Sequence, residues 1–156
     1  MADFFNDDEF DYDPEEAERE YQAQQKRKRD HPMYKQGKEI ILVVRALLES
    51  IKDERIKEMY ESNLTESAYI ISAKLSSALT TEMYTLAMQN AAIIRDHAEY
   101  IRISTSGMHM EAASHTDYII VLREEMEKFR ALFKEWVKEI QLLEDEIEDE
   151  WGLFTK

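Results

Sequence analysis

Apolar residues recur at steps of three and four positions through most of the chain after residue 33. This spacing places them on one face of an α-helix, and strand-like alternation is absent, so the pattern predicts an all-α protein. The most regular stretch lies near the C-terminus, where large side chains step alternately by four and three, as in a heptad seam. Its members are Leu122, Met126, Phe129, Phe133, Trp136, Ile140, Leu143 and Ile147.

Helix-breaking and capping residues divide this apolar stripe. Pro32 suits the first turn of a helix, and Ser104–Gly107 supplies a stop with a glycine for the C-terminal position. These marks favour an antiparallel four-helix bundle. Its predicted helices lie at about 33–51, 54–78, 82–104 and 115–149. Because the stripe crosses residue 80 in phase, three long helices are the alternative. These would span about 33–61, 65–104 and 115–149.

The two ends of the chain carry its net charge of −14. Residues 1–25 hold ten acids and one base, whereas the stretch 26–135 is neutral. An acidic segment of this kind buries too little apolar surface to offset its ordering entropy. The sequence therefore predicts a disordered tail and basic linker over 1–30, a bundle domain over 31–150 and a short tail over 151–156.

Aromatic side chains are interleaved with the acids at both ends of the chain. Such segments act as docking peptides that order on a partner, with aromatic anchors in desolvated pockets and acids that steer them to a basic surface. The alternative is that Trp151 and Phe154 fold back onto the end of the bundle. The candidate partner-binding residues are Phe4, Phe5, Phe10, Tyr12, Trp151, Leu153 and Phe154.

Composition excludes several classes of function. The chain has no cysteine, so it forms neither disulfides nor thiolate metal sites. The basic run Lys26–Arg29 directly follows the acidic tail, so we interpret it as a linker, and nucleic acid is not an expected partner. The longest aliphatic run, Ile40–Val44, is far shorter than a bilayer span. The acidic N-terminus is unlike a secretion signal, so a cytoplasmic protein without membrane contact or cofactor is expected.

Two groups of polar residues near the third predicted break are candidates for chemistry. Arg102 and His109 resemble the Arg and His motif of HEPN-type ribonucleases, in which the arginine binds phosphate and the histidine shuttles a proton. His109, Glu111 and His115 offer ligands for a metal if this segment is helical, because residues 111 and 115 then share a face. His97, on an apolar face, is predicted to bond a carboxylate at the edge of the core.

Three stretches of the chain resemble a group of small helical proteins of Bacteroidetes-type bacteria. They are His31–Gln36, Arg123–Lys138 and Glu150–Phe154. The resemblance extends over the body of the chain from about residue 31. It implies a bacterial cytoplasmic helical protein, and it brings no activity, substrate or site residue with it.

These patterns favour a non-enzymatic protein-interaction protein, of adaptor or regulatory type, in which the acidic and aromatic ends dock on a partner. A HEPN-like ribonuclease that uses Arg102 and His109 is the enzymatic alternative. A structural bundle that forms a homo-oligomer through the seam of its last helix is the third hypothesis.

Overall fold

The described part of the chain is helical almost throughout. A computed structural model describes residues 13–111, 116–145 and 148–155, apart from the side chains of residues 111 and 116. Its helices are α1 (Pro14–Asp30), α2 (Pro32–Ser50), α3 (Glu54–Ala78), α4 (Tyr84–Glu111) and α5 (Thr116–Ile140). Within these ranges no strand is present, so the all-α prediction is confirmed.

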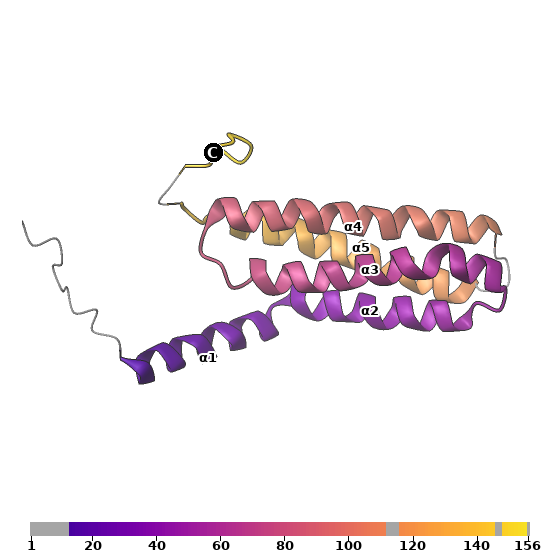
Figure 1. Cartoon of the computed structure of the whole chain (residues 1–156), viewed down its shortest axis with the longest axis horizontal. Helices are drawn as coiled ribbons and strands as arrows, with labels where there is room; N and C mark the ends of the chain where they lie inside the picture. Colours follow the sequence, from indigo (N-terminus) through magenta and orange to yellow (C-terminus); the bar gives the residue numbers. More distant parts are fainter. Residues whose placement is uncertain (1–12, 112–115, 146–147, 156) are drawn as a thin grey trace, which may run out of the picture.

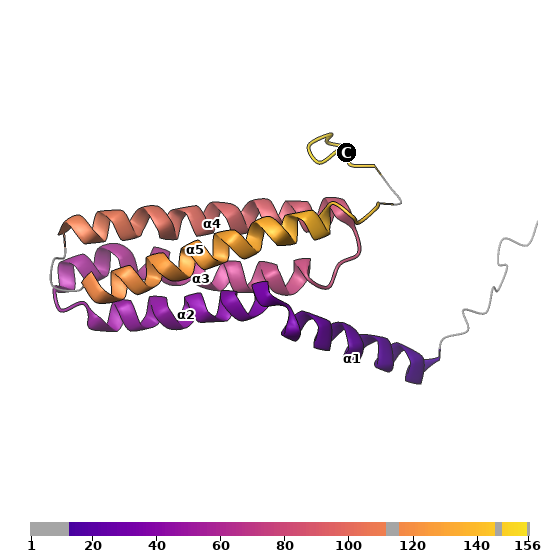
Figure 2. The same cartoon turned by 180° about the vertical axis from the view of Figure 1, so that it is seen from behind.

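Helices α2 to α5 lie side by side as an antiparallel four-helix bundle, seen from the front in Figure 1 and from behind in Figure 2. Successive helices run in opposite directions, and α2 and α4 each contact both α3 and α5, so neighbouring helices are antiparallel. Residues 79–83 leave the helical path between α3 and α4, and this break rules out the alternative of three long helices. None of the described helices is both long enough and apolar enough to cross a membrane.

The heptad seam of α5 forms one wall of the bundle's own core. Leu122, Phe129 and Trp136 are at most 3% exposed, and α5 packs against α2 and α4. The ring centroid of Phe133 lies 6.3 Å from that of Phe129 and 5.7 Å from that of Trp136, the latter in an edge-to-face arrangement. A homo-oligomer that paired the whole seam with a second copy would have to withdraw these buried side chains from the core.

His31 fixes the start of α2 and ties it to α5. Its Nδ1 accepts a hydrogen bond from the backbone N–H of Met33 at 3.1 Å, and Pro32 occupies the first helical position as predicted. Its Nε2 lies 3.0 Å from a carboxylate oxygen of Glu139, near the end of α5. Because both ring nitrogens have a partner, His31 holds the beginning of α2 against the neighbouring helix.

Helix α1 corrects the prediction of disorder over residues 1–30. Asp13 caps this helix by accepting a hydrogen bond from the backbone N–H of Glu15 at 2.9 Å. The first turn is acidic and the last turn, at residues 27–29, is basic. The charges at both ends therefore interact favourably with the helix dipole. No residue of α1 is buried. Its order therefore comes from local capping and charge, which composition alone did not indicate. Residues 1–12 lie outside the described residues.

Helix α1 extends away from one end of the bundle, beyond its junction with α2 (Figure 1). Gln24 donates from Nε2 to the carbonyl oxygen of Thr80 at 2.5 Å, in the turn between α3 and α4. At the junction, the ammonium groups of Lys28 and Lys38 lie 5.7 and 4.6 Å from the ring centroid of Tyr34. These contacts set the direction in which α1 leaves the bundle.

Helix α4 continues past its predicted end at residue 104 and reaches Glu111. Thr105 is fully buried, and its hydroxyl donates to the backbone carbonyl three residues earlier at 2.7 Å, so the helix itself satisfies this polar side chain. A β-carbon added at Gly107 would lie 2.8 Å from the hydroxyl oxygen of Tyr60 on α3. The glycine therefore leaves room for the Tyr60 side chain against α4, and it does not end the helix.

Helix α5 ends at Ile140, well before its predicted end at residue 149. The backbone N–H of Leu143 donates to the carbonyl oxygen of Ile140 at 3.0 Å, and the turn leaves Leu142 83% exposed. The acidic side chains that follow would repel one another along a helix. The end of the chain therefore departs from the bundle instead of extending α5.

Candidate functional site

A compact turn follows the bundle at the end of the described chain. We call it the Asp149 turn (residues 149–154). The carboxylate of Asp149 accepts hydrogen bonds from the backbone N–H groups of Trp151 at 3.1 Å, Leu153 at 2.9 Å and Phe154 at 2.9 Å. One side chain therefore organises the backbone on which the predicted apolar anchors stand.

Gly152 closes the Asp149 turn. Its backbone N–H donates to the carbonyl oxygen of Asp149 at 2.9 Å, and its φ of 65° lies in the left-handed region that favours glycine. The hydrogen bond from the backbone of Phe154, followed by those from Trp151 and Leu153, holds the pKa of the Asp149 carboxyl below its ordinary value. The ionised carboxylate is thus the form that supports the turn.

The Asp149 turn presents apolar side chains to solvent. Trp151 is 93% exposed and Leu153 is 75% exposed, while Phe154 is partly buried. The turn lies off the end of the bundle in Figure 1. The alternative that the segment folds back to cap the bundle is therefore wrong for Trp151. The turn therefore holds an exposed indole on a hydrogen-bonded backbone.

Asp145 ties the beginning of this segment to the bundle. Its carboxylate accepts hydrogen bonds from the backbone N–H of Thr85, at 2.9 and 3.2 Å, and from the Thr85 hydroxyl. Thr85 lies in the first turn of α4, where a helix favours an acceptor and a negative charge. Thr81, which marks the predicted start of this helix, instead accepts from the backbone N–H of Met83 at 3.2 Å.

Protonation of Asp149 is expected to loosen its turn. A carboxyl with a lowered folded-state pKa stabilises the fold above its ordinary value of 3.8, and this contribution is lost as the pH falls through the lower folded-state value. The emission of Trp151, recorded in a Trp136→Phe chain, should therefore change in this acidic range. Asp149→Asn should give the acidic spectrum at neutral pH, whereas the matched control Glu150→Gln should not. An unchanged spectrum for Asp149→Asn would contradict this role.

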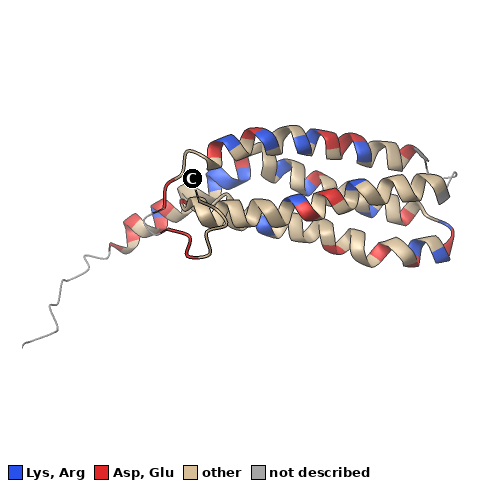
Figure 3. Ribbon diagram, turned by 90° about the horizontal axis from the view of Figure 1, so that it is seen from above, with Lys and Arg blue, Asp and Glu red and all other residues tan. Residues whose placement is uncertain are grey.

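Basic and acidic residues are interspersed along the helices of the bundle (Figure 3). Between α4 and α5 they border a cleft of about 270 Å³, which we call the α4–α5 groove. Its floor includes Met126 and Phe129, which are buried, and the partly buried Phe133. Glu99 is the acidic lining residue. The basic residues that line it are Arg95, Arg102, Arg130 and Lys134.

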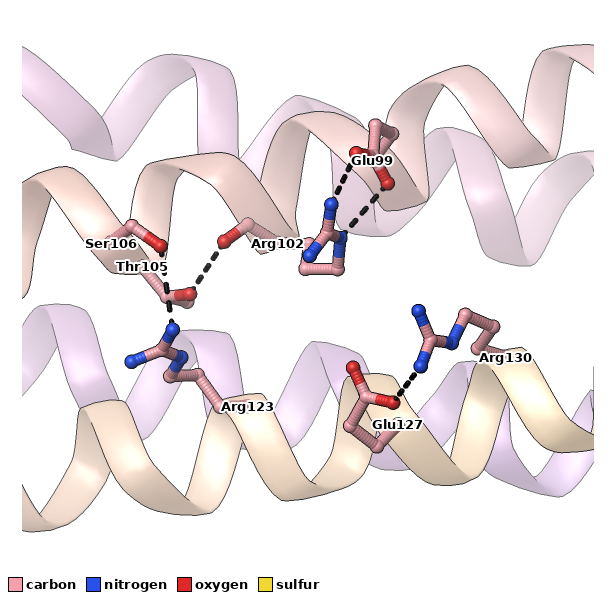
Figure 4. A network of polar contacts seen from close by, with 7 residues as sticks. All are labelled: Glu99, Arg102, Thr105, Ser106, Arg123, Glu127 and Arg130. Atoms are coloured by element: carbon pink, nitrogen blue, oxygen red, sulfur yellow. Dashed lines mark hydrogen bonds and ion pairs between the residues drawn. The ribbon is translucent and has the colours of Figure 1, made fainter.

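Two ion pairs face each other across the α4–α5 groove, one on each helix (Figure 4). Arg102 donates from Nε and Nη2 to the carboxylate of Glu99 at 3.0 and 2.6 Å. Arg130 donates from Nη2 to Glu127 at 2.6 Å. The hydrogen bond from Arg102, together with its charge, holds the pKa of Glu99 below its usual range. Arg102 is therefore engaged in a two-point contact with a carboxylate of its own helix.

The structure does not bring Arg102 and His109 together. His109 is exposed in the last turn of α4, seven residues beyond Arg102, which corresponds to about 10 Å along a helix. Of the three ligands in the predicted metal group, the structure describes the side chain of His109. The side chain of Glu111 and the whole of His115 lie outside the described residues. Among the side chains that the structure describes, no cluster suited to a metal ion is found.

The remaining predicted residues have mixed outcomes. His97 is partly buried, and its Nδ1 lies 3.1 Å from the hydroxyl of Ser67 on α3, so the predicted carboxylate partner is wrong. The hydroxyl satisfies the histidine within the interface of α3 and α4. The predicted N-terminal docking residues lie outside the described residues. They are Phe4, Phe5, Phe10 and Tyr12.

Comparisons of the chain with protein-family models, with curated proteins and with solved structures found no match. The resemblance to small bacterial helical proteins thus stays a prediction. The Asp149 turn and the α4–α5 groove are thus candidate sites defined by the geometry of this chain itself.

Proposed function

We propose that the chain is a non-enzymatic protein-interaction module, of adaptor or regulatory type, whose Asp149 turn docks on a partner protein. The observation that carries this proposal is the 93% exposure of Trp151 on a turn held by backbone hydrogen bonds to Asp149. Water disfavours an exposed indole and an exposed Leu153, and both gain free energy on entering a pocket. Tryptophan is among the residues that most often dominate an interface.

The held backbone of the Asp149 turn supports the same role. A flexible segment loses conformational entropy when it binds, and this loss weakens its affinity. The hydrogen bonds to Asp149 place Trp151 and Leu153 on a fixed backbone before any partner arrives. Less entropy is then lost on binding, so a short segment can dock with useful affinity.

The charge around the Asp149 turn indicates the kind of partner. The chain from Glu144 to Glu150 consists of acids apart from Ile147. Acids at the rim of an interface raise the association rate with a basic surface and disfavour an acidic one. The expected partner is therefore a protein with an apolar pocket bordered by lysine or arginine.

The experiment replaces Trp151 and compares it with a second exposed apolar residue. Affinity purification from the native host with the wild-type chain identifies the partner, and titration calorimetry then measures its dissociation constant. Trp151→Ala should raise this constant by about 30-fold or more, the equivalent of about 2 kcal/mol. Leu142→Ala, at a site that is 83% exposed outside the turn, is the control and should leave it unchanged. Equal affinities of the Trp151→Ala and wild-type chains would refute the proposal.

A further inference from the structure

The α4–α5 groove is bordered by basic side chains that residues of α4 and α5 neutralise weakly or not at all. Lys134 forms no ion pair within the described part of the chain. Arg95 contacts its neighbour Asp96 at 3.4 Å, with both side chains more than 70% exposed. Both cations border an apolar floor that includes Phe133. A groove with this lining suits a segment that combines carboxylates with large apolar side chains.

The first residues of the chain have this chemistry. Residues 3–12 combine five acids with four aromatic residues and contain no base. The acids are Asp3, Asp7, Asp8, Glu9 and Asp11. The aromatic residues are Phe4, Phe5, Phe10 and Tyr12. The charge of this segment is opposite to that of the groove rim, and its aromatic side chains match the apolar floor.

Helix α1 limits how far the end of this segment nearest to it can reach back toward the groove of its own copy. Asp13 lies at the outer end of α1, whose 17 residues correspond to a helix of about 25 Å (Figure 1). Phe10 stands three residues before Asp13, and three extended residues span about 10 Å. Phe10 therefore cannot return along α1 to a groove on the far side of the junction. It remains available to a neighbouring molecule.

We propose that the α4–α5 groove of one copy binds residues 3–12 of a second copy. The aromatic side chains occupy the apolar floor, and the acids pair with Arg95 and Lys134 at the rim. The proposal goes beyond the proposed function and takes up the sequence prediction that the acidic and aromatic N-terminus is a docking element. It does not depend on the Asp149 turn.

The contact joins two different surfaces, so it is a heterologous interface. If both segments of a pair dock reciprocally, the assembly closes as a dimer. If they do not, further copies join the open assembly, and its average molecular mass continues to rise with protein concentration. In either case the association involves charged groups that salt screens. The dissociation constant should therefore increase as sodium chloride is added.

Sedimentation velocity on the full chain tests the proposal. The wild-type chain should associate as its concentration rises. Arg95→Glu combined with Lys134→Glu should raise the dissociation constant by about tenfold or more. The control Lys138→Glu makes a charge reversal on the same helix at an exposed site outside the groove lining, and it should change the constant less than twofold. A wild-type chain that stays monomeric throughout, or a control with the same effect as the groove variant, would overturn the proposal.

Mixing two defective variants identifies the two halves of the contact. A chain with Phe4→Ser, Phe5→Ser and Phe10→Ser retains the groove but lacks the anchors. The Arg95→Glu, Lys134→Glu chain retains the anchors but lacks the basic rim. At a concentration where neither variant associates by itself, their mixture should form a heterodimer. A mixture that stays monomeric would contradict the proposal.

Trp151→Ala separates this inference from the function assigned to the Asp149 turn. This variant should associate like the wild type, because the turn takes no part in the contact. If Trp151→Ala abolishes self-association, the occupant is the C-terminal turn and the present inference is wrong. Loss of binding to the separate partner protein by Trp151→Ala would leave the inference intact.

Discussion

Replacing Trp136 by alanine is expected to lower the free energy of unfolding by about 3–5 kcal/mol. Trp136 is 3% exposed and packs edge-to-face against Phe133, so the truncation leaves a cavity in the core beside α5. The matched control is Trp151→Ala, since the chain has two tryptophans and Trp151 is 93% exposed. That change should alter the free energy by less than about 0.5 kcal/mol.

Urea denaturation followed by circular dichroism measures both variants. The helical signal reports on the bundle without relying on the fluorescence of the residue that is replaced. A loss of stability for Trp151→Ala as large as that for Trp136→Ala would mean that the C-terminal segment belongs to the core. The Asp149 turn would then be structural, and its assignment as a docking element would fail.

Replacing Gly37 by leucine should destabilise the bundle by about 1–3 kcal/mol through overpacking. Gly37 is buried in α2, and a β-carbon there would lie 2.8 Å from Cδ1 of Leu75, which is fully buried in α3. Leucine is a better helix former than glycine, so its intrinsic propensity acts in the opposite direction. A net loss of stability therefore reports on the tight contact between position 37 of α2 and the Leu75 side chain of α3.

A double-mutant cycle with Leu75→Ala separates this steric effect from other causes. Leu75→Ala alone leaves a cavity, at a cost of about 2–5 kcal/mol. In the double variant, the new leucine at position 37 can occupy part of that space. The combined loss of stability should be smaller than the sum of the two single losses by about 1 kcal/mol or more. Additive losses would show that the two positions do not contact each other.

The pattern of apolar residues was sufficient to predict the bundle. Pro32–Ser50 and Glu54–Ala78 agree with the predicted helices at 33–51 and 54–78 to within a residue. Both helices are amphipathic, and their ends carry local signals such as Pro32 and the capping side chain of Asp53. Capping residues such as these lie within a few residues of the helix ends that they fix, so they can be recognised in a single sequence.

The errors occur where the structure depends on something other than the apolar face. Helix α1 buries no residue, so a criterion based on apolar burial misses it. The glycine at position 107 was interpreted as a stop, because its contact with Tyr60 across the α3–α4 interface is not encoded in nearby sequence. The end of α5 was placed too late, since the heptad spacing of apolar residues continues beyond Ile140 although the helix does not.

In the candidate sites, too, features set by neighbouring residues could be predicted, whereas features set by contacts between distant residues could not. Trp151 and Leu153 were predicted as partner-binding anchors, with folding back onto the bundle as the alternative for Trp151, and the structure leaves both side chains exposed. The role of Asp149 was missed, although an aspartate followed three residues later by a glycine is a local signal for a turn. Asp145 was also missed, because its partner Thr85 lies 60 residues away. The α4–α5 groove requires the register of two packed helices, which one sequence does not provide.

Helix α1 and the Asp149 turn leave the bundle at the same end, whereas the connection from α2 to α3 lies at the opposite end (Figure 1). A partner with two linked binding sites, one for each terminus of this chain and at a matching separation, would bind one terminus first. It would then bind the second terminus in an intramolecular step. The local concentration of that terminus would then set the overall avidity. Weak individual contacts would then suffice for a long-lived complex, and the four helices of the bundle would extend away from the two binding sites.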